Sequence, residues 1–153
     1  MKLFIMTDLE GATGVAGTWE DINPGGREHL SSKKFLTGDV NAAIEGALKG
    51  GVKEILVLDG HGAAFSILLE DLHPKAQLIR GIRVLELQGL DKTFDAMFAI
   101  GAHSMAGTTG GLLTHTFRAV QILNMWLNHQ LIGEIGIWAV SYTHLRAHET
   151  GRN

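Results

Sequence analysis

Short apolar runs alternate with polar, glycine-rich segments along the first hundred residues. Residues 2–6 and 54–58 are such runs, and an aspartate follows each of them closely. Apolar runs of this length, bounded by polar residues, are typical of buried strands. Residues 77–80 and 96–100 fit the same description. The pattern therefore predicts four strands.

A helix is predicted between the first two strands, where apolar residues recur at helical spacing. Ser31 and Ser32 offer an N-cap, and Gly50 with Gly51 offers a stop. The apolar stripe consists of Phe35, Leu36, Val40, Ala43, Ile44 and Leu48. Strand, helix and strand in this order imply parallel strands joined by a right-handed crossover. We therefore expect an α/β fold, with a mainly parallel sheet and helices on both of its faces.

The pattern changes after residue 115. Residues 116–124 and 125–132 have the composition of extended segments, with a turn at 128–130. This arrangement predicts an antiparallel β-hairpin in addition to the parallel sheet. A further helix is expected to begin at Gly133 and Glu134.

Composition narrows the possible functions. The chain has no cysteine, so any metal must be held by nitrogen and oxygen ligands. A net charge of −3 without a Lys/Arg-rich run gives no electrostatic footprint for nucleic acid or an anionic membrane. The first apolar run is too short for a signal peptide or a membrane span. We expect a cytoplasmic protein whose partners are small molecules or peptides, not nucleic acid or membrane.

Potential metal ligands follow the predicted strands. They are Asp8 and Glu10 after the first strand, His61 after the second, His103 after the fourth, and Glu134 after the hairpin. The carboxyl ends of parallel strands share one edge of a sheet, where ligands bind, so these side chains could converge. Five such donors, three of them carboxylates, could hold two first-row metal ions, with Asp8 as the bridge. One strand-end Asp or His alone is more often a loop or capping residue, so the prediction depends on their joint placement.

Five short motifs together resemble the zinc-dependent D-aminopeptidase family. They are Met6-Thr7-Asp8-Leu9-Glu10-Gly11, Asp59-Gly60-His61-Gly62, Gly101-Ala102-His103, Thr114-His115-Thr116 and Gly133-Glu134-Ile135-Gly136. Their order and approximate spacing match the family over residues 1 to 138. The resemblance implies a dinuclear zinc site and a catalytic histidine. The implied zinc ligands are Asp8, Glu10, His61, His103 and Glu134, and the implied catalytic residue is His115. It also implies cleavage of N-terminal D-amino acids from short peptides, and assembly into a ring-shaped homo-oligomer.

The chain departs from the family pattern at two places. The segment from His103 to His115 is one residue longer, so the reach of His115 depends on how this loop folds. Trp138 stands where a small polar residue is usual. Asp59, two residues before His61, has two interpretations that stay open: a carboxylate that orients an imidazole, or a turn residue.

The last residues resemble a translated sequencing adapter. Residues 140–150 match one reading frame of a transposase-based library adapter, and they neither continue the helical pattern nor supply a helix cap. We therefore expect residues 1–138 to be a metal-binding catalytic domain truncated at its C-terminus, and residues 139–153 to be a non-natural tail. A helix cut at Trp138 has little stability of its own, so we expect this chain to fold poorly or to be inactive.

Two other functions compete with a peptidase. The chain could be a non-catalytic α/β module in which the strand-end acids and histidines bind the hydroxyls of a nucleotide or sugar. It could also be a metal hydrolase of a cyclic amide or ester. Stoichiometric zinc and inhibition by a chelator would favour an enzyme, and substrate profiling would separate the two hydrolases.

Overall fold

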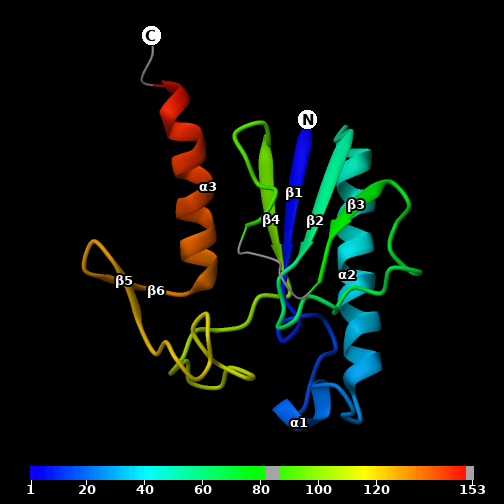
Figure 1. Cartoon of the computed structure of the whole chain (residues 1–153), viewed down its shortest axis with the longest axis vertical. Coiled ribbons are helices and arrows are strands. Elements are labelled where there is room, and N and C mark those ends of the chain that lie inside the picture. Colours follow the sequence, from blue (N-terminus) through cyan, green and yellow to red (C-terminus); the bar gives the residue numbers. More distant parts are fainter. Residues whose placement is uncertain (82–86, 151–153) are drawn as a thin grey trace. The chain divides into compact units, whose positions relative to one another are not determined.

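The computed structural model describes residues 1–81 and 87–150, with the backbone alone for residues 145–150. The chain divides into two compact units, Met1–Ala102 and His103–Asn153. The first unit contains a parallel sheet and its covering helix, and the second contains a hairpin followed by a long helix (Figure 1).

A four-stranded parallel sheet forms the centre of the first unit. Its strands are β1 (Lys2–Thr7), β2 (Glu54–Asp59), β3 (Ala76–Ile79) and β4 (Ala96–Ile100), in the order β3-β2-β1-β4. All four predicted strands are thus confirmed, with bounds within one residue of those expected. The apolar side chains of β1, from Leu3 to Met6, are at most 1% exposed, and the strand lies inside the sheet between β2 and β4. Its near-continuous apolar sequence is typical of a strand buried on both faces.

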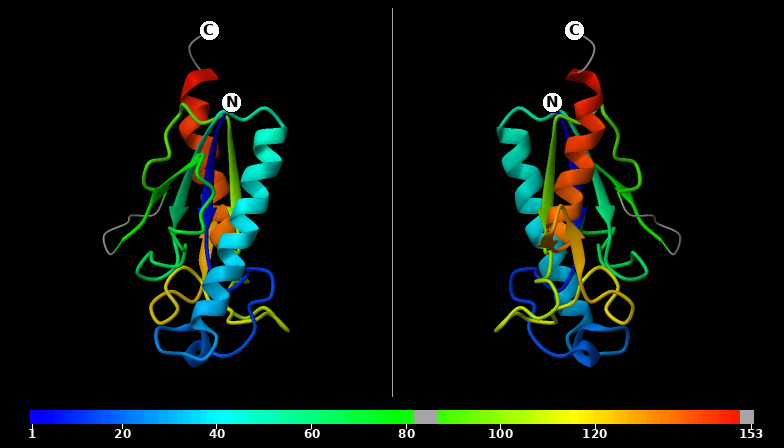
Figure 2. Two further views of the ribbon diagram at one scale, coloured as in Figure 1. Left: turned by 90° about the vertical axis from the view of Figure 1, so that its right-hand side faces the viewer. Right: turned by 90° about the vertical axis from the view of Figure 1, so that its left-hand side faces the viewer.

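Helix α2 (His29–Lys49) lies along one face of the sheet (Figure 2). Its buried positions recur every three or four residues, as the predicted stripe requires. They are Ser32, Leu36, Thr37, Val40, Ile44 and Ala47. Phe35, which was expected in the core, is instead 43% exposed, because it lies just beside this stripe. The other long helix belongs to the second unit, so the helix layer expected on the opposite face of the sheet stays a prediction.

The predicted start of α2 was wrong by a few residues. The helix begins at His29, and Ser32 is buried inside it rather than serving as its cap. The preceding loop fixes this start, since the His29 ring lies 2.7 Å from the Ile22 carbonyl oxygen. Ile22 ends α1 (Trp19–Ile22), the short helix of this loop.

Two side chains of α2 hold the loops that follow β1 and β2. The Thr13 amide donates to Asp39 Oδ2 at 2.7 Å, and the Leu68 amide donates to Thr37 Oγ1 at 3.0 Å. The helix therefore covers the sheet and also fastens both loops through polar side chains.

The second unit contains the predicted hairpin. Strands β5 (Met125–Leu127) and β6 (Gln130–Ile132) pair in antiparallel fashion. Asn128 and His129 connect them with φ of 47° and 64°, as a two-residue mirror-image turn requires. Residues 116–124, expected to be extended, form turns and bends instead. The reason is local: Phe117 adopts a φ of 57°, and the amides of residues 121 and 122 both donate to the Arg118 carbonyl.

Helix α3 (Glu134–Thr150) begins where the sequence predicts and continues through the adapter-like residues. The expectation that these residues leave the helical pattern was therefore wrong. Thr143 Oγ1 donates to the Ala139 carbonyl, so this part of the chain bonds as an ordinary helix turn. The non-natural origin of residues 139–153 stays a prediction, and residues 151–153 lie outside the described part. Within that part, no helix combines the length and apolar character needed to cross a bilayer.

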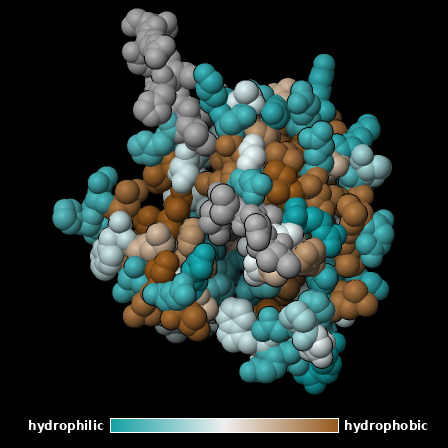
Figure 3. Space-filling view, viewed as in Figure 1, coloured by the Kyte–Doolittle hydropathy of each residue, from teal (hydrophilic) through white to brown (hydrophobic). Residues whose placement is uncertain are grey.

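Several apolar side chains lie on the surface of the second unit. Val120 is 95% exposed, Leu123 is 71% exposed and Trp126 is 64% exposed. Apolar colouring is visible in Figure 3 on the left, where β5 and β6 lie in the same view of Figure 1. Trp126 is directly opposite the exposed Leu131 on the hairpin, so one face of the hairpin exposes apolar area.

Two glycine substitutions should change stability in opposite directions. Gly46 is exposed on α2 with nothing near an added Cβ, so Gly46→Ala should raise the free energy of unfolding by about 0.5–1 kcal/mol. Gly101 has a φ of 73°, and a Cβ added there would meet the Asp8 carbonyl oxygen. Gly101→Ala should therefore lower the free energy of unfolding by at least about 1–2 kcal/mol. Urea unfolding measures both, and a similar effect of the two substitutions would contradict the close approach at Gly101.

Candidate metal centres

The first unit brings Asp8, Glu10 and His61 together at the carboxyl ends of β1 and β2. These neighbouring strands run in register up to the pair Thr7 and Asp59, so the two chains leave the sheet side by side. His61 Nδ1 lies 3.0 Å from Glu10 Oε2 and 3.3 Å from Asp8 Oδ1. One donor atom from each of the three side chains lies within 4.8 Å of the others. The structure thus assembles three of the predicted ligands, which we call the first group.

Backbone contacts explain why the loop after β1 stays beside the sheet. The Asp8 amide donates to the Ile100 carbonyl, and the Gly11 amide donates to the Gly101 carbonyl at 2.8 Å. A Cβ at Gly11 would meet the Ala102 carbonyl, so only glycine allows this approach. The carboxylates of Asp8 and Glu10 are therefore held on a segment that continues the line of β1.

The first group concentrates acidic charge in a buried place. Glu10 is 3% exposed and Asp8 is 6% exposed. Burial raises the pKa of Glu10, and the negative charge of Asp8 raises it further. The hydrogen bond from His61 acts in the opposite direction and lowers the pKa. Burial alone would lower the pKa of His61, but the hydrogen bonds and charges of Asp8 and Glu10 outweigh it and raise the pKa to about 10. Two buried carboxylates and an imidazole, all facing one another, are a donor set that fits zinc.

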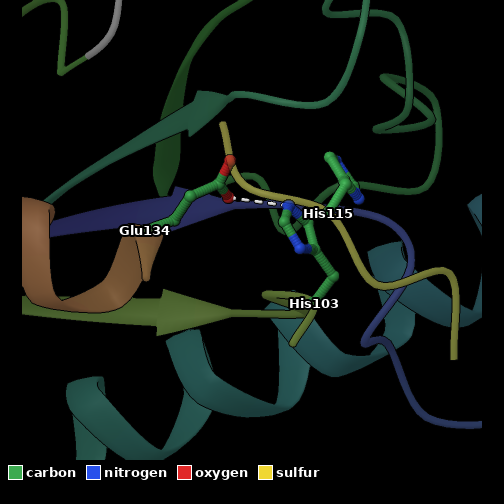
Figure 4. Close-up of side chains that lie close together, drawn as sticks. All are labelled: His103, His115 and Glu134. Atoms are coloured by element: carbon green, nitrogen blue, oxygen red, sulfur yellow. Dashed lines mark ion pairs between the residues drawn. The ribbon is translucent and has the colours of Figure 1, made fainter. Parts of the chain in front are cut away.

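The second unit brings together His103, His115 and Glu134, which we call the second group (Figure 4). His103 Nε2 lies 2.8 Å from Glu134 Oε2, at the first residue of α3. The rings of His103 and His115 are stacked, with centroids 3.4 Å apart and planes inclined by 19°. His103 and Glu134 are buried, and His115 is half-buried. Two further predicted ligands and the predicted catalytic residue therefore lie in one place.

Backbone carbonyls determine the tautomers in the second group. His115 Nδ1 lies 2.8 Å from the Leu113 carbonyl oxygen, and His103 Nδ1 lies 3.0 Å from that of Ser104. A carbonyl only accepts, so both Nδ1 atoms carry the proton, and Nε2 of neutral His115 keeps its lone pair. Around His103, acceptors face both ring nitrogens, and one neutral ring cannot donate to both. A cation held by His103 Nε2 and the Glu134 carboxylate would satisfy both of these groups, so this donor set also fits zinc.

The longer loop between His103 and His115 does not carry His115 away from the site. The His115 amide donates to the Ser104 carbonyl at 3.2 Å, and the Ala106 amide donates to Thr116 Oγ1. The loop therefore doubles back and closes on itself. Its turns include Gly110, which has a φ of 73°.

The five predicted ligands thus fall into two groups, one in each unit. Their meeting at a single edge, and the bridging role of Asp8, stay predictions. Asp59 does not contact His61 through a hydrogen bond; its carboxylate binds the amides of Ser66 and Ile67, as a turn residue does. Burial raises the pKa of Asp59, and these two amides oppose the rise.

Sequence reasoning missed Thr37, whose hydroxyl binds the loop after β2. The one signal in the sequence is a polar residue on the buried face of a predicted helix. Such a residue usually bonds within its own helix, as Thr37 also does by donating to the Lys33 carbonyl. Its second partner, Leu68, is distant in sequence and could not be predicted.

Comparisons with known proteins agree with the family resemblance of the five sequence motifs. A family model described as D-aminopeptidase matches residues 1–147. A curated D-aminopeptidase of Bacillus subtilis (strain 168) is 30% identical over 139 residues, which are 90% of this chain and 50% of that protein. The solved structure of the "Zn-dependent D-aminopeptidase DppA from Bacillus subtilis, a self-compartmentalizing protease" has a TM-score of 0.84 and 29% identity. The match covers 95% of this chain and 53% of that one, so the chain spans about half the length of these relatives.

Alanine at His61 or at His103 should remove zinc from one group at a time. Each histidine supplies a ring nitrogen to a different donor set, so each variant should lower the zinc content of the protein. Elemental analysis after dialysis measures the metal content of the purified protein. The matched control is His73→Ala, because His73 lies in the first unit but belongs to neither group. Unchanged metal content in both test variants would contradict the ligand assignment.

Proposed function

Since the chain belongs to the D-aminopeptidase family, we propose that it forms the zinc-binding part of an aminopeptidase that removes N-terminal D-amino acids from short peptides. The observation that carries this proposal is the presence of two separate donor groups, each with three side chains whose donor atoms lie within 4.8 Å. Each group would hold one zinc ion, giving two ions per chain. The ligands are Asp8, Glu10 and His61 for one ion, and His103 with Glu134 for the other.

The chemistry of such a site divides between the metal and the protein. Bound zinc would supply Lewis-acid polarisation of the substrate carbonyl. His115 would move protons. Its Nδ1 donates to the Leu113 carbonyl, so Nε2 would accept a proton from the water that attacks the peptide carbonyl and would return it to the leaving amine as the C–N bond breaks. The stacking of His115 against His103 holds its ring beside the ligand set. Peptide hydrolysis needs no further cofactor.

The same proposal includes an assembly. The relative with a solved structure is described as a self-compartmentalizing protease. In this chain, the hairpin exposes Trp126 and Leu131 opposite one another, and aromatic residues with aliphatic neighbours are frequent at interfaces between subunits. We therefore propose a ring-shaped homo-oligomer in the cytoplasm that takes up short peptides.

The direct test is hydrolysis of matched dipeptides. The zinc-loaded aminopeptidase of which this chain forms part should release D-alanine from D-Ala-D-Ala and leave L-Ala-L-Ala intact, measured by chromatography of the products. A chelator such as 1,10-phenanthroline should abolish the activity, and added zinc should restore it. Hydrolysis of cyclic amides or esters without dipeptide cleavage would favour a different hydrolase. Metal-free binding of a nucleotide or sugar, with no hydrolysis, would favour a binding module.

Replacing His115 by alanine should separate catalysis from metal binding. The variant should keep its zinc and lose about 10²- to 10⁴-fold in kcat, because a positioned proton-transfer group contributes that much. Stopped assays with D-Ala-D-Ala and elemental analysis of the same sample measure the two quantities. The control is His129→Asn, a histidine of the hairpin turn whose positive φ asparagine tolerates.

Two other results would revise the role of His115. If His115→Ala lowers kcat by less than about threefold, the loss is well below the one usually seen for a proton-transfer group. His115 would then be a spectator. Loss of an ion together with the activity would make it a ligand, as its place in the second group also permits.

A further inference from the structure

Asp59, the last residue of β2, is fully buried and holds the loop that carries His61. Its Oδ2 accepts hydrogen bonds from the Ser66 amide at 2.6 Å and from the Ile67 amide at 2.8 Å. We call residues 60–68 the His61 loop. The next amide in this loop, that of Leu68, donates to Thr37 Oγ1. Three consecutive amides at the far end of the His61 loop are therefore bound by side chains outside it.

The near end of the His61 loop is bound as well. The Gly60 amide donates to the Thr7 carbonyl at 3.0 Å, which keeps the loop against β1. The Ala64 amide then donates to the His61 carbonyl at 2.8 Å and closes a turn around the histidine. Ala64 has a φ of 58°, a conformation that residues with a side chain rarely adopt. The loop is thus held in a shape that its own sequence does not favour, and it depends on contacts at both ends.

The direction of the His61 ring depends on this shape. Its Nδ1 must stay within hydrogen-bond distance of both Glu10 and Asp8, which are fixed by β1 and lie on a different loop. Release of the far end would let Ala64 leave its left-handed conformation and open the turn that orients His61. Replacing a residue that orients a metal ligand without binding the metal itself typically lowers the metal affinity by about 10- to 100-fold.

We propose that Asp59 is a positioning residue that sets the zinc affinity of the first group by holding the amides of Ser66 and Ile67. The inference rests on the proposed function, because it assumes that Asp8, Glu10 and His61 bind zinc. Asp59 acts through an acceptor oxygen. Asparagine at this position keeps an acceptor oxygen at the same reach and should therefore replace aspartate, whereas alanine should not.

The experiment measures zinc affinity and not turnover. Calorimetric titration with zinc is carried out in a His103→Ala background, where the first group is the remaining site. Asp59→Ala should weaken binding by about 10- to 100-fold, and Asp59→Asn should stay within about threefold of the parent. Hydrogen exchange should show the Ser66 and Ile67 amides protected in the parent and in Asp59→Asn, and unprotected in Asp59→Ala.

Two controls separate positioning from general stability. Ile44→Ala removes buried volume from α2 in the same unit, so it should lower stability and leave the zinc affinity unchanged. In a His61→Ala background, where the second group is the remaining site, Asp59→Ala should not change the affinity. A loss of affinity with Ile44→Ala equal to that with Asp59→Ala would overturn the positioning role.

The outcomes distinguish this inference from the function on which it rests. No zinc binding in the His103→Ala background would overturn the proposed function, and the inference with it. Normal binding that Asp59→Ala leaves unchanged would overturn the inference alone. If Asp59→Ala does not fold, the Asp59→Asn variant is used instead. Zinc affinity retained in this variant, together with protected Ser66 and Ile67 amides, supports the positioning role of Asp59. A loss of affinity in Asp59→Asn would overturn it, since the acceptor oxygen is still present.

Discussion

The parallel pairing of β1 with β2 is the constraint on which the first group depends. The two strands stay in register from Lys2 and Glu54 to Thr7 and Asp59, so their carboxyl ends stop at the same level. Asp8 and Glu10 on one chain then face His61 on the other. A shift of the register by one residue would reverse which side chains face α2 and would separate His61 from the two acids. The geometry of the site is therefore a consequence of how the core strands pack.

The cost of this arrangement is electrostatic. Buried carboxylates lose hydration, and the two acids of the first group also repel one another, which is why the pKa of Glu10 is raised. His61 offsets part of this cost by placing its ring nitrogen between the two acids. In the second group, Glu134 and the Ser104 carbonyl compete for the protons of one histidine. Both groups are therefore places where a cation would relieve an unfavourable concentration of acceptors.

Polar contacts outside the donor groups give the site its precision. Asp59 and Thr37 bind successive amides of the loop that carries His61, and Thr116 closes the loop that carries His115. These residues hold the backbone of the loops on which His61 and His115 lie. A loop on a rigid sheet edge needs such contacts, because its backbone groups have no strand partner to hold them.

The sequence alone determined the strands, the hairpin and the kinds of candidate donor side chain. Apolar runs located all four parallel strands and turn residues located the hairpin. Strand-end acids and histidines identified the candidate metal donors. All of these features depend on neighbouring residues. Tertiary structure decided the rest. Loop contacts set the start of α2, and the fold of the loop between His103 and His115 stacked the two rings. The amides of Ser66 and Ile67 gave Asp59 its role. Each of these outcomes depends on atoms brought together by packing between segments, and no local pattern of residues records which segments will meet.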